Sequence, residues 1–251
     1  MISLKSKDWQ ISNVETVLFD KDGTFIDLHY FWGKMTELRV QEIIKRFEIS
    51  PDNFEKLCLS LGYDVNSKKM LSDGITALYS RSKIIEIFKG DLVEYGVSIT
   101  EVELAKIFDY VSEIFYQDMA KYTRPIEPAI EFIKQLHQKG LKLGVVTSDS
   151  VVSTELTLKK FGWVDLFGVV VGRESSSETK ESGALTKIAL EKLSANPKTT
   201  VMIGDAPMDY ISAKNAGIDN TILVATGQID TEELKQTSEF VLTNLSEMEI
   251  V

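Results

Sequence analysis

The chain has 251 residues, which is enough for one large α/β domain or for a core with a smaller inserted domain. Hydrophobic residues make up 43% of it, a share that supports a sizeable core and excludes wholesale disorder. Lys and Arg number 28 against 38 Asp and Glu, and the resulting net charge of −10 argues against a general nucleic-acid-binding protein, which needs cations for the phosphates.

The first segment, Met1 to Gln10, is polar and lacks the apolar stretch of a signal peptide. No apolar run in the chain approaches the roughly 20 residues that are needed to span a bilayer. The single cysteine, Cys58, excludes an internal disulfide and a thiolate zinc site, and it lies in an apolar stretch where it should simply pack. We therefore expect a cytoplasmic protein that has no membrane partner.

A short apolar, β-branched run from Val14 to Phe19 predicts a buried strand, and Asp20-Lys21-Asp22-Gly23-Thr24 follows it as a turn. Helical patterns then alternate with four similar apolar runs, at 141–146, 169–171, 200–203 and 221–224. The clearest helical pattern covers 126–139 and ends at Gly140. This alternation predicts an α/β fold, with a parallel sheet covered by helices on both faces.

The middle of the chain, from about Asp27 to Tyr122, shows amphipathic helices and no convincing strand. Within it, Thr100-Glu101-Val102-Glu103 fits a capping box that opens one of the helices. The sequence thus predicts a core domain made of residues 1–26 and 123–251, with a helical domain of residues 27–122 inserted after the first strand.

Polar side chains follow three of the predicted strands. The first strand is followed by Asp20 and Asp22, the second by Thr147-Ser148-Asp149, and the fourth by Gly204-Asp205-Ala206-Pro207-Met208-Asp209. Ligands of open α/β sheets bind at the carboxyl ends of the strands, where these side chains should converge. Asp205 should also act as the N-cap of the helix that follows it.

A convergence of carboxylates at this edge has a chemical consequence. Two carboxylates about 4 Å apart repel by roughly 4 kcal/mol at an effective dielectric constant near 20, so the cluster needs a cation or a proton. Ligands that are all oxygen suit Mg²⁺ before Zn²⁺. One carboxylate could then attack a phosphate as nucleophile while a second protonates the leaving oxygen. The hydroxyl of Thr147 can donate to a phosphoryl oxygen, Gly23 allows a tight turn, and Lys180 would complete the charge balance.

These residues resemble the four motifs of the haloacid dehalogenase superfamily. The segment Asp20 to Thr24 is similar to the first motif, Thr147 to the second, Lys180 to the third, and Gly204-Asp205 with Asp209 to the fourth. The third motif often has proline after its lysine, where this chain has Glu181. The resemblance implies a Rossmann-like three-layer core with an inserted helical cap of the C1 kind, as in the phosphoglycolate-phosphatase-like branch.

The resemblance also implies roles for single residues. The first aspartate of the family is the nucleophile and the second is the general acid and base, which here are Asp20 and Asp22. Mg²⁺ would be held by Asp20, the backbone carbonyl of Asp22 and Asp205, with Asp209 nearby. The substrate phosphate is expected to contact a small set of residues in these motifs: Gly23, Thr24, Thr147, Ser148 and Lys180.

The function expected from this reading is hydrolysis of a small phosphate monoester, phosphoglycolate among the candidates, through an aspartyl-phosphate. A phosphomutase similar to β-phosphoglucomutase would share every core residue, and that alternative stays open. A dehalogenase would not need Asp22, and a phosphonatase would not need it to protonate an oxygen. A signalling receiver domain would be about half as long, and a non-catalytic relative would be expected to lack Asp20 or Asp22. The sequence does not identify the substrate or the oligomeric state.

Overall fold

In the computed structural model, which describes residues 2–251, the apolar run after Glu15 forms a fully buried strand, β3 (Thr16–Phe19). It lies near the middle of a six-stranded sheet of order β10-β9-β8-β3-β6-β7, in which all neighbours are parallel. The remaining strands of the sheet are β6 (Lys142–Val146), β7 (Val169–Val171), β8 (Thr200–Gly204), β9 (Asn220–Val224) and β10 (Phe240–Leu242). The predicted parallel sheet is therefore confirmed, and β10 extends it at one edge.

The register of the sheet aligns the ends of its central strands. Phe19, the last residue of β3, pairs with Val145 of β6 on one side and with Ile203 of β8 on the other. The residues that follow these three strands consequently emerge at the same edge, where ligands of open α/β sheets bind.

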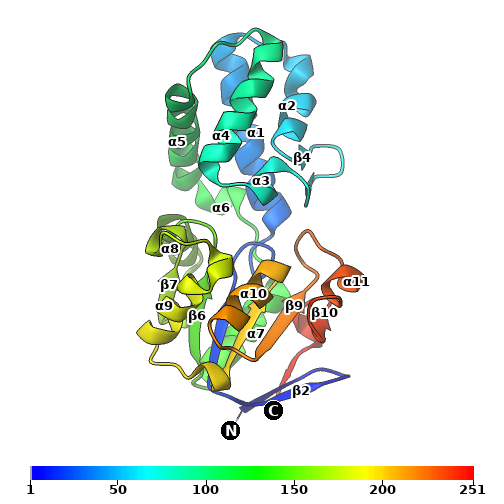
Figure 1. Ribbon diagram of the computed structural model, residues 1–251, viewed down its shortest axis with the longest axis vertical. Helices are drawn as coiled ribbons and strands as arrows, with labels where there is room; N and C mark the ends of the chain where they lie inside the picture. Colours follow the sequence, from blue (N-terminus) through cyan, green and yellow to red (C-terminus); the bar gives the residue numbers. More distant parts are fainter. Residues whose placement is uncertain (1) are drawn as a thin grey trace. The chain divides into compact units, whose positions relative to one another are not determined.

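Helices cover both faces of the sheet (Figure 1). The helices α9 (Ala184–Lys192) and α10 (Pro207–Asn215) contact each other and share an apolar cluster with Leu18 and Met202 of the sheet. The helices α7 (Glu127–Gln138) and α8 (Val151–Phe161) join strands in the opposite direction along the sheet, so right-handed crossovers place them on the other face. A short helix, α11 (Thr231–Leu234), connects β9 to β10.

A small antiparallel sheet joins the two ends of the described chain. It has the order β11-β1-β2 and is formed by β1 (Ile2–Lys5), β2 (Gln10–Val14) and β11 (Glu249–Ile250). Beside it, the ring of Trp9 packs edge-on against Phe240 of β10, with 5.0 Å between ring centroids. The polar opening segment gave no strand signal, because only Leu4 within β1 is fully buried.

The chain divides into two units, and the second, Leu28–Thr123, is called here the helical unit. The remainder, up to Asp27 and from Arg124 to Val251, is the core unit. The helical unit contains α1 (Leu28–Phe47), α2 (Phe54–Ser60), α3 (Ile75–Leu78), α4 (Arg81–Leu92), α5 (Glu101–Gln117) and α6 (Met119–Tyr122). Its helices enclose an apolar core of their own, which includes the buried Cys58.

Two details of the helical unit can be compared with the sequence. The expected capping box is present at the start of α5, between Thr100 and Glu103. The expectation that this segment holds no strand is wrong, because β4 (Tyr63–Asp64) and β5 (Lys69–Met70) form a two-stranded hairpin. Strands of two residues are too short to produce an alternating pattern, so the sequence carries no periodic signal for them.

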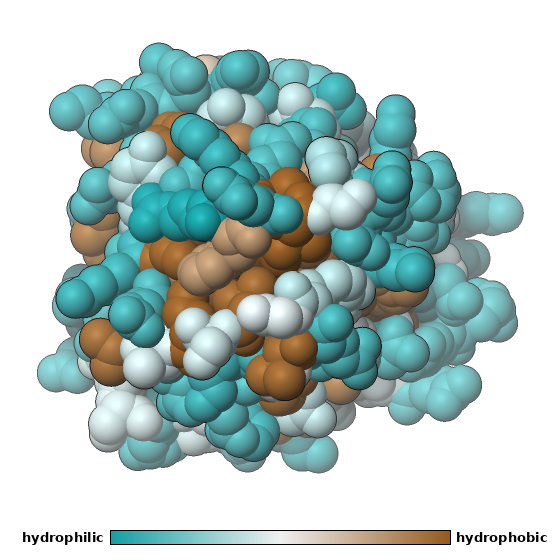
Figure 2. All heavy atoms as spheres, turned by 90° about the horizontal axis from the view of Figure 1, so that it is seen from above, coloured by the Kyte–Doolittle hydropathy of each residue, from teal (hydrophilic) through white to brown (hydrophobic). Residues whose placement is uncertain are grey.

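The surface of the molecule is mostly hydrophilic in the view of Figure 2, with an apolar area near the middle of the face shown. Across residues 2–251, every helix is too short or too polar to serve as a membrane span.

Candidate active site

The turn after β3 is organised by a single carbonyl group. Asp20 continues the strand, since its N–H donates to the carbonyl of Ile203 at 2.8 Å. The carbonyl of Lys21 then accepts hydrogen bonds from three consecutive N–H groups, those of Thr24, Phe25 and Ile26. The backbone therefore turns back sharply, and Asp20 and Asp22 are held at the carboxyl end of the strand, each with 8% of its surface exposed.

Three carboxylates converge beside this turn. One oxygen each of Asp20, Asp205 and Asp209 lies within 4.8 Å of the others, and all three residues are buried. Lys180, in the short 3₁₀ helix Lys180–Ser182, places Nζ at 2.6 Å from Oδ1 of Asp20 and at 2.6 Å from Oδ1 of Asp209. One ammonium against three carboxylates leaves two negative charges uncompensated when all of them are ionised. The donor set therefore fits a hard divalent cation.

The same excess charge perturbs the carboxyl groups when no cation is present. Burial, and then repulsion from Asp20 and Asp209, raises the pKa of Asp205 well above its ordinary value. Burial also raises the pKa of Asp209 to about 6, although the ammonium of Lys180 opposes the shift. A bound cation would favour the ionised form of both groups.

Glycines allow the backbone to approach these carboxylates closely. Gly23 has φ of +86°, and a Cβ on it would lie 2.3 Å from Oδ2 of Asp205. A Cβ on Gly204 would lie 2.1 Å from Oδ2 of Asp209, and one on Gly227 would lie 1.7 Å from Oδ2 of Asp205. Side chains at these positions would displace the two aspartates, so the glycines are needed for the geometry of the cluster.

One part of this arrangement, the loop after β9, could not be predicted from the sequence. Here the hydroxyl of Thr226 donates to the backbone carbonyl of Gly23 in a short hydrogen bond, and Gly227 abuts Asp205. This hydrogen bond therefore links the turn after β3 to the end of β9, although β9 is not next to β3 in the sheet. The only signal in the sequence is a Thr-Gly pair two residues after an apolar run, which is common in ordinary turns.

Asp22 belongs to a separate ion network. Its Oδ1 lies 2.7 Å from Nζ of Lys21, and the same ammonium lies 2.9 Å from Oδ2 of Asp149, in the loop after β6. Burial raises the pKa of Asp22 to about 6, and Lys21 opposes that shift. Burial alone would also raise the pKa of Asp149, but Lys21 and the N–H of Ser150 lower it. The side chain of Asp22 is thus outside the acidic cluster, and the metal contact that the family resemblance implies for Asp22 is through its backbone carbonyl.

The residues expected to contact phosphate differ in their surroundings. Thr147 follows β6 and is buried, and its Oγ1 accepts the N–H of Asp149 at 3.1 Å. Ser148 is exposed, and its hydroxyl donates to Sδ of Met208 at 3.5 Å. This contact joins the loop after β6 to the first turn of α10. Thr24 is only 1% exposed, and within residues 2–251 its hydroxyl has no hydrogen-bond partner.

The expectation that Asp205 is the N-cap of α10 is wrong. The cap is Ala206, whose N–H donates to Oδ2 of Asp209 at 3.1 Å, and Pro207 is the first residue of the helix. Asp205 lies one residue earlier, and its carboxylate faces Asp20 and Asp209 instead of the helix.

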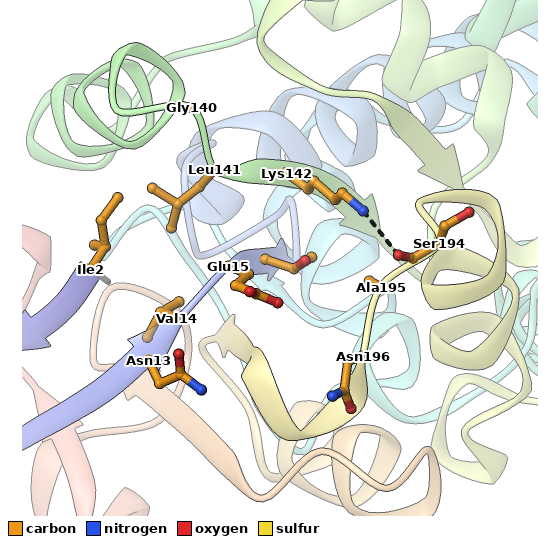
Figure 3. Close-up of a pocket in the computed structure, with 11 residues that line it drawn as sticks. Ile2, Asn13, Val14, Glu15, Gly140, Leu141, Lys142, Ser194, Ala195 and Asn196 are labelled. Atoms are coloured by element: carbon orange, nitrogen blue, oxygen red, sulfur yellow. Dashed lines mark hydrogen bonds between the residues drawn. The ribbon is translucent and has the colours of Figure 1, made fainter.

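The core unit also has a hollow away from this site (Figure 3). It has a volume of about 460 Å³ and lies at the amino ends of β3 and β6, lined among others by Glu15 and Lys142. The ammonium of Lys142 is already bound by the carbonyls of Leu193 and Ser194, both at 2.9 Å. Among the described residues that line this hollow, Glu15 is the one carboxylate, whereas three carboxylates converge at the opposite end of the strands.

Comparison with known protein families gives one family match. Residues 17–224 match the model of the haloacid dehalogenase-like hydrolases. The matched range begins in β3, contains the whole helical unit and ends with β9, and so includes every residue of the acidic cluster.

Two curated relatives illustrate the range of names among similar proteins. A phosphoglycolate phosphatase from Vibrio vulnificus is 33% identical over 211 residues, which cover 81% of this chain and 81% of the relative. A putative pyrophosphatase PpaX from Caldanaerobacter subterraneus subsp. tengcongensis is 28% identical over 223 residues, covering 89% of this chain and 87% of the relative.

Solved structures show the same fold at lower identity. A predicted phosphoglycolate phosphatase from Haemophilus somnus aligns with a TM-score of 0.70 at 17% identity, covering 94% of this chain and 97% of that one. A putative β-phosphoglucomutase from Thermotoga maritima aligns with a TM-score of 0.69 at 16% identity, covering 93% and 96%.

Proposed function

The chain belongs to the haloacid dehalogenase-like hydrolases, and from this premise we propose that it is a Mg²⁺-dependent phosphatase that uses Asp20 as its nucleophile. The observation that carries the proposal is the position of Asp20. It is a buried carboxylate at the end of the central strand, paired with Lys180 at 2.6 Å and grouped with Asp205 and Asp209. An attacking group, a cation and an anionic substrate can meet only where charges are balanced in this way.

In the proposed reaction, the carboxylate of Asp20 attacks the phosphorus of a phosphate monoester and the bond to the leaving oxygen breaks. Asp22 donates a proton to that oxygen, and its pKa of about 6 suits a group that must give up a proton and later take one back. Water then attacks the aspartyl-phosphate while Asp22 accepts its proton. Free phosphate and the unmodified Asp20 result.

Asp20, Asp205 and Asp209 supply the oxygens for a metal ion, and the backbone carbonyl of Asp22 is a further candidate. When bound, Mg²⁺ would neutralise the charge of the phosphoryl group, which the carboxylates alone would repel. Lys180 keeps the carboxylate of Asp20 in place, and the hydroxyl of Thr147 is the proposed donor to a phosphoryl oxygen. Gly23, Thr24 and Ser148 are proposed to complete the phosphate site.

The proposed substrate is a small phosphorylated metabolite. Relatives named for phosphoglycolate and for pyrophosphate hydrolysis support a small anionic substrate, and phosphoglycolate is the first to test.

The test is phosphate release from a panel that contains phosphoglycolate, several sugar phosphates, p-nitrophenyl phosphate and inorganic pyrophosphate. Each compound is assayed with Mg²⁺ and with EDTA, for the wild type, Asp20→Asn and the control Asp165→Asn, which changes an exposed aspartate. We expect release that requires Mg²⁺, persists in the control and falls by about 10³-fold or more in Asp20→Asn, because the nucleophile is lost.

Turnover that survives in Asp20→Asn would rule out this residue as the nucleophile. Conversion of a sugar phosphate into its positional isomer without phosphate release would identify a mutase instead. Activity that is the same in Mg²⁺ and in EDTA would contradict the proposed role of the acidic cluster.

A further inference from the structure

Lys21 stands between the two aspartates of the turn after β3, and its side chain is fully buried. We propose that Lys21 is a positioning residue, which uses Asp149 as its counter-ion to hold the carboxyl group of Asp22 in the orientation needed for proton transfer. This inference rests on the proposed function and adds a residue to it. Neither the acidic cluster nor the phosphate contacts described above include Lys21.

The contacts of the ammonium group define this role. Nζ lies 2.7 Å from Oδ1 of Asp22 in a hydrogen-bonded ion pair. It also lies 2.9 Å from Oδ2 of Asp149, in a second ion pair. The exposed fractions of the three side chains are 0% for Lys21, 10% for Asp22 and 4% for Asp149. The ammonium is therefore held by two carboxylates that solvent hardly reaches.

Packing alone does not call for a lysine at this position. The backbone of the turn is organised by the carbonyl of Lys21, which any residue would supply. Apolar residues of similar volume often stabilise a protein interior as well as a buried ion pair does, because they avoid the desolvation of charges. The charged side chain has a specific consequence, which is that it fixes the position of a second charge.

Asp149 is a firm anchor for the lysine because its own backbone and side chain are bound. Its Oδ1 accepts the N–H of Ser150 at 2.7 Å, its N–H donates to Oγ1 of Thr147, and its carbonyl accepts the N–H of Arg173 at 3.0 Å. Lys21 therefore connects Asp22 to the loop that carries Thr147. The proposed proton donor and the proposed phosphate contact are thus positioned by one network.

The consequence for catalysis concerns the two oxygens of Asp22. The ion pair between Oδ1 and the ammonium restrains the carboxyl group, and Oδ2 is the oxygen that we assign to proton delivery. Without Lys21 this restraint would be lost, and the alignment for proton transfer would be weakened. The attack by Asp20 does not depend on this orientation.

This difference gives a selective test with Lys21→Met. The value of kcat/KM reports the steps up to departure of the leaving group. It is measured for the alkyl phosphate that the wild type hydrolyses best and for p-nitrophenyl phosphate, whose phenolate leaves with little need of a proton. We expect kcat/KM to fall by about 30-fold or more for the alkyl ester and by less than about 3-fold for the aryl ester, since general acid catalysis serves mainly the first.

Two further variants control for folding. Lys21→Met leaves Asp22 and Asp149 without their shared cation, which can destabilise the protein, whereas Lys21→Met/Asp149→Asn also removes one of the two carboxylate charges. We expect the double variant to unfold at a higher temperature than Lys21→Met while keeping the same selective loss on the alkyl ester. The exposed Lys187 provides the matched control, and Lys187→Met should leave both esters unchanged.

The outcomes separate the inference from the function on which it rests. If the wild type is active and kcat/KM falls equally for the two esters in Lys21→Met and in Lys21→Met/Asp149→Asn, Lys21 is merely structural. That result would overturn the inference. A double variant with wild-type activity on the alkyl ester would overturn it as well. A folded wild type that releases phosphate from neither ester would instead overturn the proposed function, and the inference with it.

Discussion

Lys180→Met removes the only cation that contacts the acidic cluster within the described residues. The side chain of Lys180 is 3% exposed, and its ammonium group lies 2.6 Å from a carboxylate oxygen of Asp20 and of Asp209. Methionine has a similar length and no charge, so the substitution isolates the electrostatic contribution. We expect a large loss of stability that Mg²⁺ partly restores.

The magnitude follows from the geometry of the cluster. Two carboxylates 4.8 Å apart or closer repel by at least roughly 3 kcal/mol at an effective dielectric constant near 20. Removing one partner of a buried ion pair generally costs about 3–5 kcal/mol, because the other charge is left uncompensated. For a chain of this size, a loss of that order lowers the melting temperature by about 6 to 20 °C.

The assay is urea unfolding of the wild type and Lys180→Met in EDTA and in saturating Mg²⁺. The matched control is Lys198→Met, which removes an ion pair with Asp219 whose side chains are 62% and 59% exposed. An exposed pair contributes about 0–1 kcal/mol, and its loss should not depend on Mg²⁺. In Lys180→Met the loss should be smaller in Mg²⁺ than in EDTA, since a bound cation replaces part of the missing charge.

A loss in EDTA no greater than that of the control would refute this reasoning. A loss of the same size with and without Mg²⁺ would show that the cation does not share the environment of Lys180.

Two further predictions test other parts of the site. Burial raises the pKa of Asp209 to about 6 from an ordinary 3.8, so the folded, cation-free protein binds this proton more tightly than the unfolded chain does. The resulting stability should be complete below about pH 4 and be lost as the pH rises through about 6; urea titrations in EDTA should show this slope, and it should flatten in Asp209→Asn. Gly227→Ala places a Cβ 1.7 Å from Oδ2 of Asp205, and it should weaken Mg²⁺ binding, measured by calorimetry, by about tenfold or more. Gly90→Ala, with nothing within 4 Å in α4, should leave Mg²⁺ binding unchanged.

The parallel sheet could be predicted because its strands are buried on both faces. Four-residue β3 has no exposed position, and after Thr16 its residues are apolar up to Asp20. Once the order of strands and helices is known, the carboxyl ends of neighbouring strands must meet, and this places Asp20 and Asp205 at one edge. The hairpin of β4 and β5 could not be predicted because strands of two residues give no periodic pattern. The sheet at the chain ends could not be predicted because it depends on a pairing that is distant in sequence, that of Leu4 with Ile250.

The directions of the side chains within the turns were harder to predict from the sequence. The same stretch of sequence would allow Asp205 to cap α10 or to face Asp20, and the structure places its carboxylate close to Gly23 and Gly227. The burial of Lys21 was harder still to predict, because a lysine in a turn is usually solvated. Its partner Asp149 lies 128 positions later in the chain, and no local pattern indicates that their charges are paired.

The two buried lysines explain how aspartates two residues apart can have different roles. Lys180 pairs with Asp20 and Asp209, while Lys21 pairs with Asp22 and Asp149, so each aspartate of the turn belongs to its own ion network. Burial raises the pKa of Asp22 most, and the charges of Lys21 and Asp149 act on it before that of Asp20. The pKa of the proposed acid therefore depends more on its own surroundings than on the charge of the proposed nucleophile. Carboxyl groups whose environments differ in this way can serve as nucleophile and as acid in one reaction.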